Sequence, residues 1–75
     1  MQKIQLISCD AKRPDRRAIA NMIEEVSNNV DGSLASELTD ILLDGDSVEI
    51  IVDDKHTSSA YRAIRKLSID YELLD

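Results

Sequence analysis

Residues 33–44 read SLASELTDILLD, and the conformation of this stretch decides the fold of the chain. Its apolar residues Leu34, Leu38, Ile41 and Leu42 recur at the spacing i, i+4, i+7 and i+8, which is typical of one face of an α-helix. The residues opposite them are polar or acidic and suit contact with water. The spacing therefore predicts a helix whose apolar residues face the core.

Residues 34–43 also have an alternative interpretation as a strand. The dipeptide Asp44-Gly45 follows them, and Asp-Gly is a common hairpin turn between two strands. A strand here gives the order βαββαβ, a ferredoxin-like arrangement. It also places a serine and an aspartate on the same face as the leucines, which a half-buried strand does not favour. The helix is the better fit, with Gly45 just past its end.

The residues before this stretch predict a strand and then a helix. In residues 3–9, Ile4 and Leu6 alternate with polar residues, and Ile7 falls on the second face. Pro14 suits the first turn of a helix, where its missing N–H costs nothing. The apolar stripe of that helix consists of Ile19, Met22, Ile23, Val26 and Val30.

The residues after it predict a strand, a helix and a final strand. Residues 47–52 alternate as a strand does, and residues 53–56 form a loop. Thr57 or Ser58 can cap the next helix. The apolar stripe of that helix consists of Ala60, Tyr61, Ile64 and Leu67, and the inward residues of the last strand are Ile69, Tyr71 and Leu73.

These elements predict one α+β domain over residues 1–75, in the order β-α-α-β-α-β. Two helices in succession return the second strand antiparallel to the first, and one helix then makes the third strand parallel to the second. The simplest three-stranded sheet has the first strand in the middle. All helices then cover one face of the sheet, which gives a two-layer sandwich.

The composition excludes several classes of protein. The 75 residues contain one cysteine, Cys9, and one histidine, His56, so a disulfide within the chain and a histidine-based metal site are not expected. A chain this short cannot hold both a full core and a deep catalytic cleft. No stretch has the pattern of a signal peptide or a membrane span. We therefore expect a cytoplasmic protein that is not an enzyme, uses no cofactor or metal and has no membrane partner.

The charges are distributed unevenly along the chain. The net charge is −6, but residues 21–54 carry ten acidic residues and no Lys or Arg. Residues 1–20 balance at +3, and residues 55–75 balance at +1. A solvated surface that keeps a small protein in solution accounts for such a composition. The alternative is a polarised molecule whose acidic middle meets a basic partner.

The first candidate binding site is a basic cluster at the predicted start of the first helix. It consists of Lys12, Arg13, Arg16 and Arg17. Cations at a helix N-terminus oppose the helix dipole, so this cluster is expected to hold an anion or an acidic partner. Removing its charge is then expected to leave stability unchanged or slightly raised. The alternative is that these residues form structural ion pairs with Asp10, Asp15 or the acidic middle.

The second candidate site is an apolar strip on the sheet face that the helices leave open. Because side chains alternate along a strand, three apolar residues are predicted to point away from the helices: Ile7, Ile51 and Leu74. An isolated exposed apolar residue means little, but three together favour a homodimer or a partner surface.

The order of elements resembles two families of α+β domains. Asp31-Gly32-Ser33-Leu34 and the run from Ser47 to Asp75 are similar to the C-terminal domain of the bacterial ribosomal stalk protein and to the Clp-protease adaptor family. That resemblance implies a domain that recruits other proteins. The segments Asp10–Asp15 and Val48–Asp54 are similar to ACT regulatory domains, which implies a βαββαβ module that binds amino acids, usually as a dimer.

Together these features favour a small acidic protein-interaction module, such as an adaptor, a regulator or an inhibitor of a larger machine. A protein partner is expected, and nucleic acid is not. One alternative is an ACT-like domain that senses a small molecule. A second alternative is an acidic mimic of nucleic acid.

Overall fold

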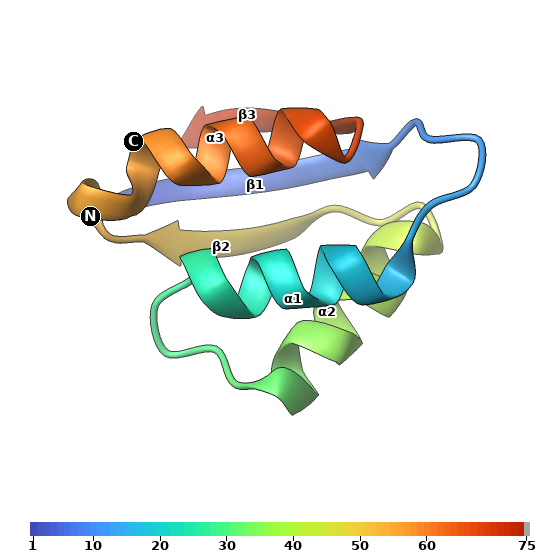
Figure 1. Ribbon diagram of the computed structural model, residues 1–75, viewed down its shortest axis with the longest axis horizontal. Coiled ribbons are helices and arrows are strands. Elements are labelled where there is room, and N and C mark those ends of the chain that lie inside the picture. The colour runs from blue at the N-terminus through green and yellow to red at the C-terminus, as the bar shows by residue number, and fades with distance from the viewer. Residues whose placement is uncertain (75) are drawn as a thin grey trace.

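Seven elements follow one another along residues 1–74, which are the residues that the computed structural model describes (Figure 1). They are β1 (Gln2–Cys9), α1 (Arg16–Val26), α2 (Gly32–Leu43), β2 (Val48–Val52), a 3₁₀ turn (Asp54–His56), α3 (Thr57–Lys66) and β3 (Ile69–Leu74). The predicted order β-α-α-β-α-β is therefore confirmed, as is the α+β class.

The three strands form one sheet in the order β2-β1-β3. The central strand β1 is antiparallel to both neighbours, with Ile4 opposite Ile50 on one side and opposite Leu73 on the other. This is the predicted topology. A bulge in β1, which the sequence did not predict, places both Ile7 and Ser8 opposite one residue of β3.

Residues 34–43 are helical, so the alternative βαββαβ order is not the fold of the chain. The Asp31 carboxylate accepts a hydrogen bond from the Leu34 N–H at 2.9 Å and caps the start of α2. At the other end, Gly45 has a φ of +101° and its N–H donates to the Leu42 carbonyl at 3.1 Å. This left-handed turn closes the helix in a Schellman motif, so Asp44-Gly45 acts as a helix end.

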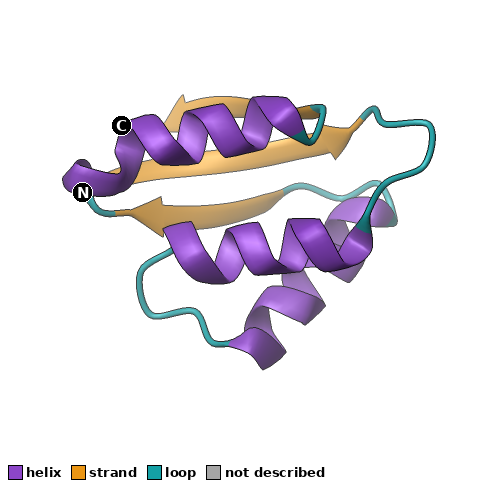
Figure 2. Cartoon of the chain, viewed as in Figure 1, coloured by secondary structure: helices purple, strands orange, loops and turns teal. Residues whose placement is uncertain are grey.

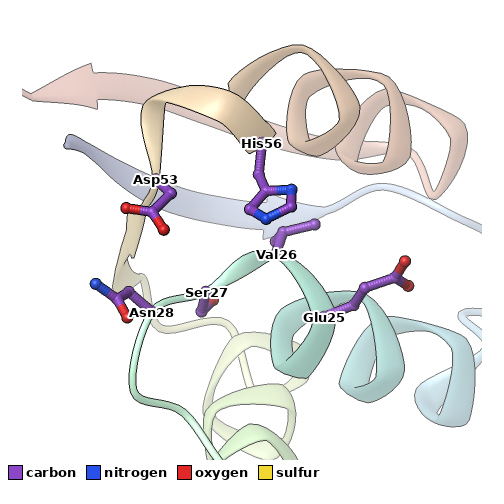
Figure 3. Close-up of a pocket in the computed structure, with 6 residues that line it drawn as sticks. All are labelled: Glu25, Val26, Ser27, Asn28, Asp53 and His56. Carbon is purple, nitrogen blue, oxygen red and sulfur yellow. The ribbon is translucent and has the colours of Figure 1, made fainter.

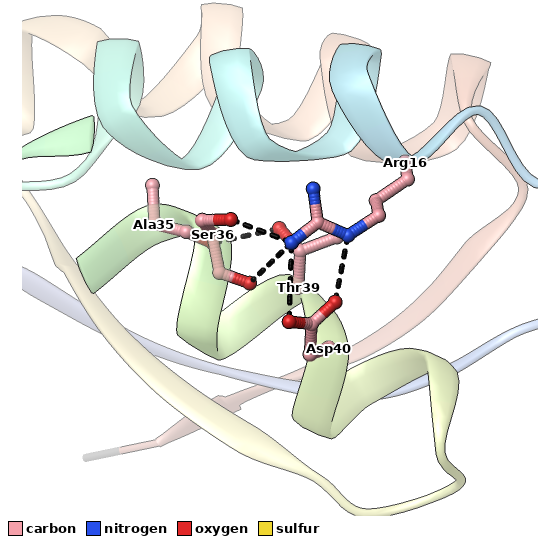
Figure 4. Close-up of polar contacts among 5 residues, drawn as sticks. All are labelled: Arg16, Ala35, Ser36, Thr39 and Asp40. Atoms are coloured by element: carbon pink, nitrogen blue, oxygen red, sulfur yellow. Dashed lines mark hydrogen bonds and ion pairs between the residues drawn. The ribbon is translucent and has the colours of Figure 1, made fainter. Parts of the chain in front are cut away.

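The buried face of α2 matches the predicted one only in part, since Leu42 is buried and Leu38 is half-buried against the core, as predicted. Ala35, Thr39 and Leu42 are buried, whereas Leu34 and Ile41 are 40% and 41% exposed. Ala35 and Thr39, which have small side chains, lie on the side of α2 toward α1 (Figure 4), and the Thr39 hydroxyl donates to the Ala35 carbonyl at 2.7 Å. The face with the smaller side chains is therefore the one that packs, and two large apolar residues remain outside.

Helix α1 is shorter at both ends than the sequence predicts. Asp15 is the N-cap, accepting from the Ala18 N–H at 3.1 Å, so Pro14 lies before the helix and not in its first turn. The helix ends at Val26 because the next residues turn to the sheet, where the N–H of Asn28 donates to a β2 carbonyl at 2.7 Å. Val30 therefore lies in the loop, half-buried against the core.

Helix α3 follows the short 3₁₀ turn, and Thr57 is its first residue. Neither Thr57 nor Ser58 caps this helix, since the residue before it, His56, is the N-cap and makes no side-chain hydrogen bond. The Thr57 hydroxyl instead donates to the Asp53 carbonyl at 3.2 Å. The apolar stripe of α3 was predicted correctly, with Ala60 and Ile64 buried and Tyr61 and Leu67 half-buried.

The core lies between the helices and one face of the sheet. Ile4, Leu6, Ile50 and Val52 point into it and are at most 2% exposed. Helix α1 packs against both other helices, and α3 packs against β3. The other face of the sheet has no helix over it (Figure 1). Among the described helices, none combines the length and the apolar content needed to cross a membrane.

Candidate functional site

The basic cluster predicted from the sequence spans the loop between β1 and α1 and the first turn of α1 (Figure 2). Lys12, Arg13, Arg16 and Arg17 are all exposed. The structure does not bring them together as one site, because Arg16 turns away from the loop and reaches across to α2.

The guanidinium group of Arg16 fastens the start of α1 to α2 (Figure 4). Its Nε donates to Oδ1 of Asp40 at 2.7 Å, and its Nη2 donates to Oδ2 at 3.1 Å. The same Nη2 donates to the Ser36 hydroxyl at 2.6 Å. The two hydrogen bonds to Asp40 fix both the distance and the orientation between α1 and α2. The hydrogen bonds from Arg16 hold the pKa of Asp40 below its usual value.

Arg16 therefore forms an ion pair within the fold, and we now expect that removal of its charge lowers stability. The sequence offered ion pairing with the acidic middle as the alternative for this cluster, and Asp40 belongs to that middle. For Lys12, Arg13, Arg16 and Arg17, partner binding stays a prediction.

Two carboxyl groups lie beside the base of the same loop. A hydrogen bond with Asp70, together with the like charge of that carboxylate, raises the pKa of Asp10. The Asp10 N–H also donates to the Ser68 carbonyl at 2.9 Å, which joins the end of β1 to the turn before β3. These carboxylates make the surroundings of the loop less attractive to an anion than its own sequence suggests.

The open face of the sheet is apolar only in parts. Ile7 and Ile51 are exposed on it, at 41% and 43%, and Leu74 is half-buried. Lys3 lies directly between Ile51 and Leu74, since it is opposite both in the strand register. Ile7 is four residues further along β1, or about 13 Å away. The three residues thus share a face, as predicted, but form no continuous strip.

A small polar pocket lies at the end of α1 (Figure 3). Its volume is about 140 Å³, and it is lined by Glu25, Val26, Ser27, Asn28, Asp53 and His56. The hydroxyl oxygen of Ser27 is buried and has no hydrogen-bond partner in the described chain. Within residues 1–74, no group of three His, Cys, Asp or Glu side chains is arranged to hold a metal ion. Cys9 is half-buried against the core and lies elsewhere.

A continuous apolar stripe lies on the exposed side of α2. Leu34, Leu38 and Ile41 follow the spacing i, i+4 and i+7, and the half-buried Leu38 joins the stripe to the core. Glu37 and Asp44 border it on the same helix. The sequence signal for this surface was present, but the leucines and the isoleucine were assigned to the core. We call these three residues the α2 stripe.

A second surface of opposite charge lies on α3. Ser58, Tyr61, Arg62 and Arg65 follow the spacing i, i+3, i+4 and i+7 and line an open groove of about 310 Å³. The Tyr61 ring stacks on that of Tyr71 in β3, with centroids 5.6 Å apart and an angle of 13° between the planes. All four residues of this groove come from α3, so their helical spacing is visible in the sequence, whereas the stacking of Tyr61 on Tyr71 is not. We call these four residues the α3 stripe.

Comparison of the chain with protein-family models, curated proteins and solved structures found no match. The resemblances to the ribosomal stalk domain, the Clp-protease adaptors and the ACT domains therefore stay predictions from the sequence pattern, although the βαββαβ order that the ACT resemblance implies is not the order of this chain.

Proposed function

We propose that this protein is a non-enzymatic interaction module that binds a basic amphipathic helix of a partner protein along the α2 stripe. The observation that carries the proposal is the exposure of Leu34 and Ile41, 40% and 41%, on a helix bordered by carboxylates. An isolated apolar residue of this kind is ordinary, but a stripe at helical spacing is the usual form of a helix-binding surface.

The charges around the stripe define the chemistry of the partner. Residues 18–54 contain no Lys or Arg, and the Arg16 guanidinium is occupied by Asp40 on the side of α2 that faces α1. Glu37 and Asp44 lie next to Ile41 on the other side. A helix with an apolar face flanked by Lys and Arg therefore complements the α2 stripe in hydrophobicity and in charge.

A basic amphipathic peptide of leucine and lysine is a suitable probe. We expect it to bind with chemical-shift changes centred on Leu34, Leu38 and Ile41, and we expect a peptide of the same composition in scrambled order to bind at least about tenfold more weakly, a difference of about 1.4 kcal/mol. The combined variant Leu34→Gln and Ile41→Gln removes the apolar contact while keeping helix-forming residues.

The matched control is Ile51→Gln, since Ile51 is as exposed, at 43%, but lies on the open sheet face. Binding that survives the α2 variant and is lost in the Ile51 variant assigns the partner surface to the sheet and contradicts the proposal. Equal binding of the ordered and scrambled peptides reduces the interaction to non-specific charge attraction and contradicts it as well.

A further inference from the structure

The α3 stripe carries two arginines that the rest of the described chain leaves free. Among residues 1–74, no carboxylate oxygen lies within 4.0 Å of a side-chain nitrogen of Arg62 or Arg65. The chain has 15 acidic residues, so the absence of a partner is not due to a shortage of carboxylates. Two guanidinium groups one turn apart are suited to bind carboxylates supplied from outside.

The α3 stripe continues into the edge of the sheet. The stacked rings of Tyr61 and Tyr71 join α3 to β3, and β3 is a terminal strand in the order β2-β1-β3. Its backbone groups pair with β1 on one side only, so the outer edge offers hydrogen bonds to a further strand. The groove over α3 and the free strand edge are therefore parts of one surface.

The two sides of this edge differ in chemistry. On the helix side, β3 presents Tyr71 and Leu73, and Leu73 is 48% exposed although it pairs with a buried residue of β1. On the open side, β3 presents Asp70 and Glu72, both exposed, and the half-buried Leu74. A strand added here must place apolar or acidic side chains toward α3 and basic side chains toward the open face.

We propose that the β3 edge and the α3 stripe together bind an extended segment of a partner protein, which adds to the sheet as a fourth strand. Alternate side chains of this segment are apolar or acidic, and these contact the tyrosines and arginines. The intervening side chains are basic and face Asp70 and Glu72. Backbone pairing supplies affinity and the alternation supplies specificity, as in other cases of strand addition.

A second copy of the chain is disfavoured at this edge. If two β3 strands paired with Asp70 opposite Glu72, like charges would lie directly opposite one another on the open side, which is destabilising. The acidic surface of α2 in a second copy cannot bind this edge either. The backbone groups of a helix are paired within the helix and cannot add a strand to the sheet. Nucleic acid is disfavoured by the net charge of −6 and by the small number of free cations at the site.

Two synthetic peptides of identical length and composition test the proposal. In one, the glutamates share a face with the leucines and the lysines occupy the other face; in the other, glutamates and lysines are exchanged. We expect the first peptide to bind about tenfold more tightly than the second, with shifts of the Tyr71 and Leu73 amide signals. A version of the first peptide with N-methylated backbone amides is expected not to bind, since it cannot pair with the edge.

The combined variant Arg62→Gln and Arg65→Gln is expected to reduce the preference between the two peptides to the part that comes from Asp70 and Glu72 on the open face. Lys66→Gln is the matched control, because Lys66 is exposed on the same helix but does not line the groove. Equal affinity for the two peptides, unchanged binding of the N-methylated peptide, or loss of the preference in the Lys66 variant alone overturns the proposal. Tighter binding of a single-stranded oligonucleotide at the same amides also overturns it.

Discussion

The rotation of α2 can be tested with two identical substitutions on the same helix, Leu42→Ala and Leu34→Ala. Leu42 is 1% exposed in the core and Leu34 is 40% exposed on the α2 stripe. Replacing a buried leucine by alanine costs about 2–5 kcal/mol, because the lost apolar burial and the cavity left behind add. For a domain whose free energy of unfolding is roughly 5 kcal/mol, that loss is a large fraction of the total.

Leu34→Ala should cost much less. A fully buried leucine side chain contributes about 1.5–3 kcal/mol, and with 40% of Leu34 exposed only about three-fifths of that is available. Water fills the vacated space, so no cavity cost arises, and alanine forms helices slightly better than leucine. Three-fifths of that range is about 0.9–1.8 kcal/mol, and the Cβ that alanine keeps retains part of it, so we expect a loss of about 1 kcal/mol.

Urea unfolding and thermal melting of the two variants measure the difference. A loss of about 3 kcal/mol for Leu42→Ala corresponds to a fall in Tm of roughly 12–24 °C, whereas Leu34→Ala should lower the Tm by less than about 8 °C. Equal losses of stability, or a larger loss for Leu34→Ala, would refute the observed rotation of α2. The proposed binding site on the α2 stripe would then be refuted with it.

Three further predictions concern stability. Arg16→Glu should lower the urea midpoint at pH 7 and Arg17→Glu should not, because only Arg16 pairs with a carboxylate of α2, that of Asp40. The contribution of this pair to stability is present above the usual carboxyl pKa of 3.8. It is lost as the pH falls through the lowered pKa of Asp40. Asp10→Asn should raise stability at pH 7, because it removes the repulsion between Asp10 and Asp70. The pKa of Asp10 is raised in the fold, so this gain in stability should shrink as the pH falls through the raised pKa toward 3.8. Unfolding measured as a function of pH checks this. Ser68 has a φ of +61°, so Ser68→Gly should raise the free energy of unfolding by about 0.5–1 kcal/mol in the same urea assay.

The order and pairing of the elements could be predicted because they depend on local patterns and on simple connection rules. The alternation of Ile4 and Leu6 and the helical spacing of Ile19, Met22 and Ile23 identify a strand and a helix directly. Once the elements are known, two helices followed by one helix leave few ways to arrange three strands. The central position of β1 follows from that count.

The rotation of α2 could not be predicted from its own sequence. Leu34, Leu38, Ile41 and Leu42 fit one helical face in hydrophobicity, but packing against α1 selects the face that contains the smaller Ala35. The packing of two helices depends on the side-chain volumes of both helices, whereas hydrophobic periodicity describes each helix alone.

The candidate site depended on contacts between residues far apart in the chain. Arg16 and Asp40 are 24 positions apart, and neither sequence position identifies the other as its partner. The same is true of Tyr61 and Tyr71, which become one surface only when β3 lies beside α3. The bulge in β1 has no local signal either, since it is set by the register of β3. Surfaces that combine residues from different helices and strands therefore could not be predicted from the sequence patterns.

The two proposed surfaces should respond to salt in opposite directions. With a net charge of −6, the molecule attracts a basic helix from a distance and repels a segment rich in glutamate. At physiological ionic strength the Debye length is about 8 Å, whereas the molecule measures 30 × 22 × 18 Å, so each face then acts largely on its own. Raising the salt from low to physiological concentration should slow association of the basic peptide with the α2 stripe. An acidic variant of the strand peptide, with serines in place of its lysines, should associate with the β3 edge faster over the same range, because screening removes the long-range repulsion and the short-range contacts remain. Stopped-flow association rates test this, and rates that fall with salt for both peptides would show that the field of the whole molecule does not govern the approach of the acidic one.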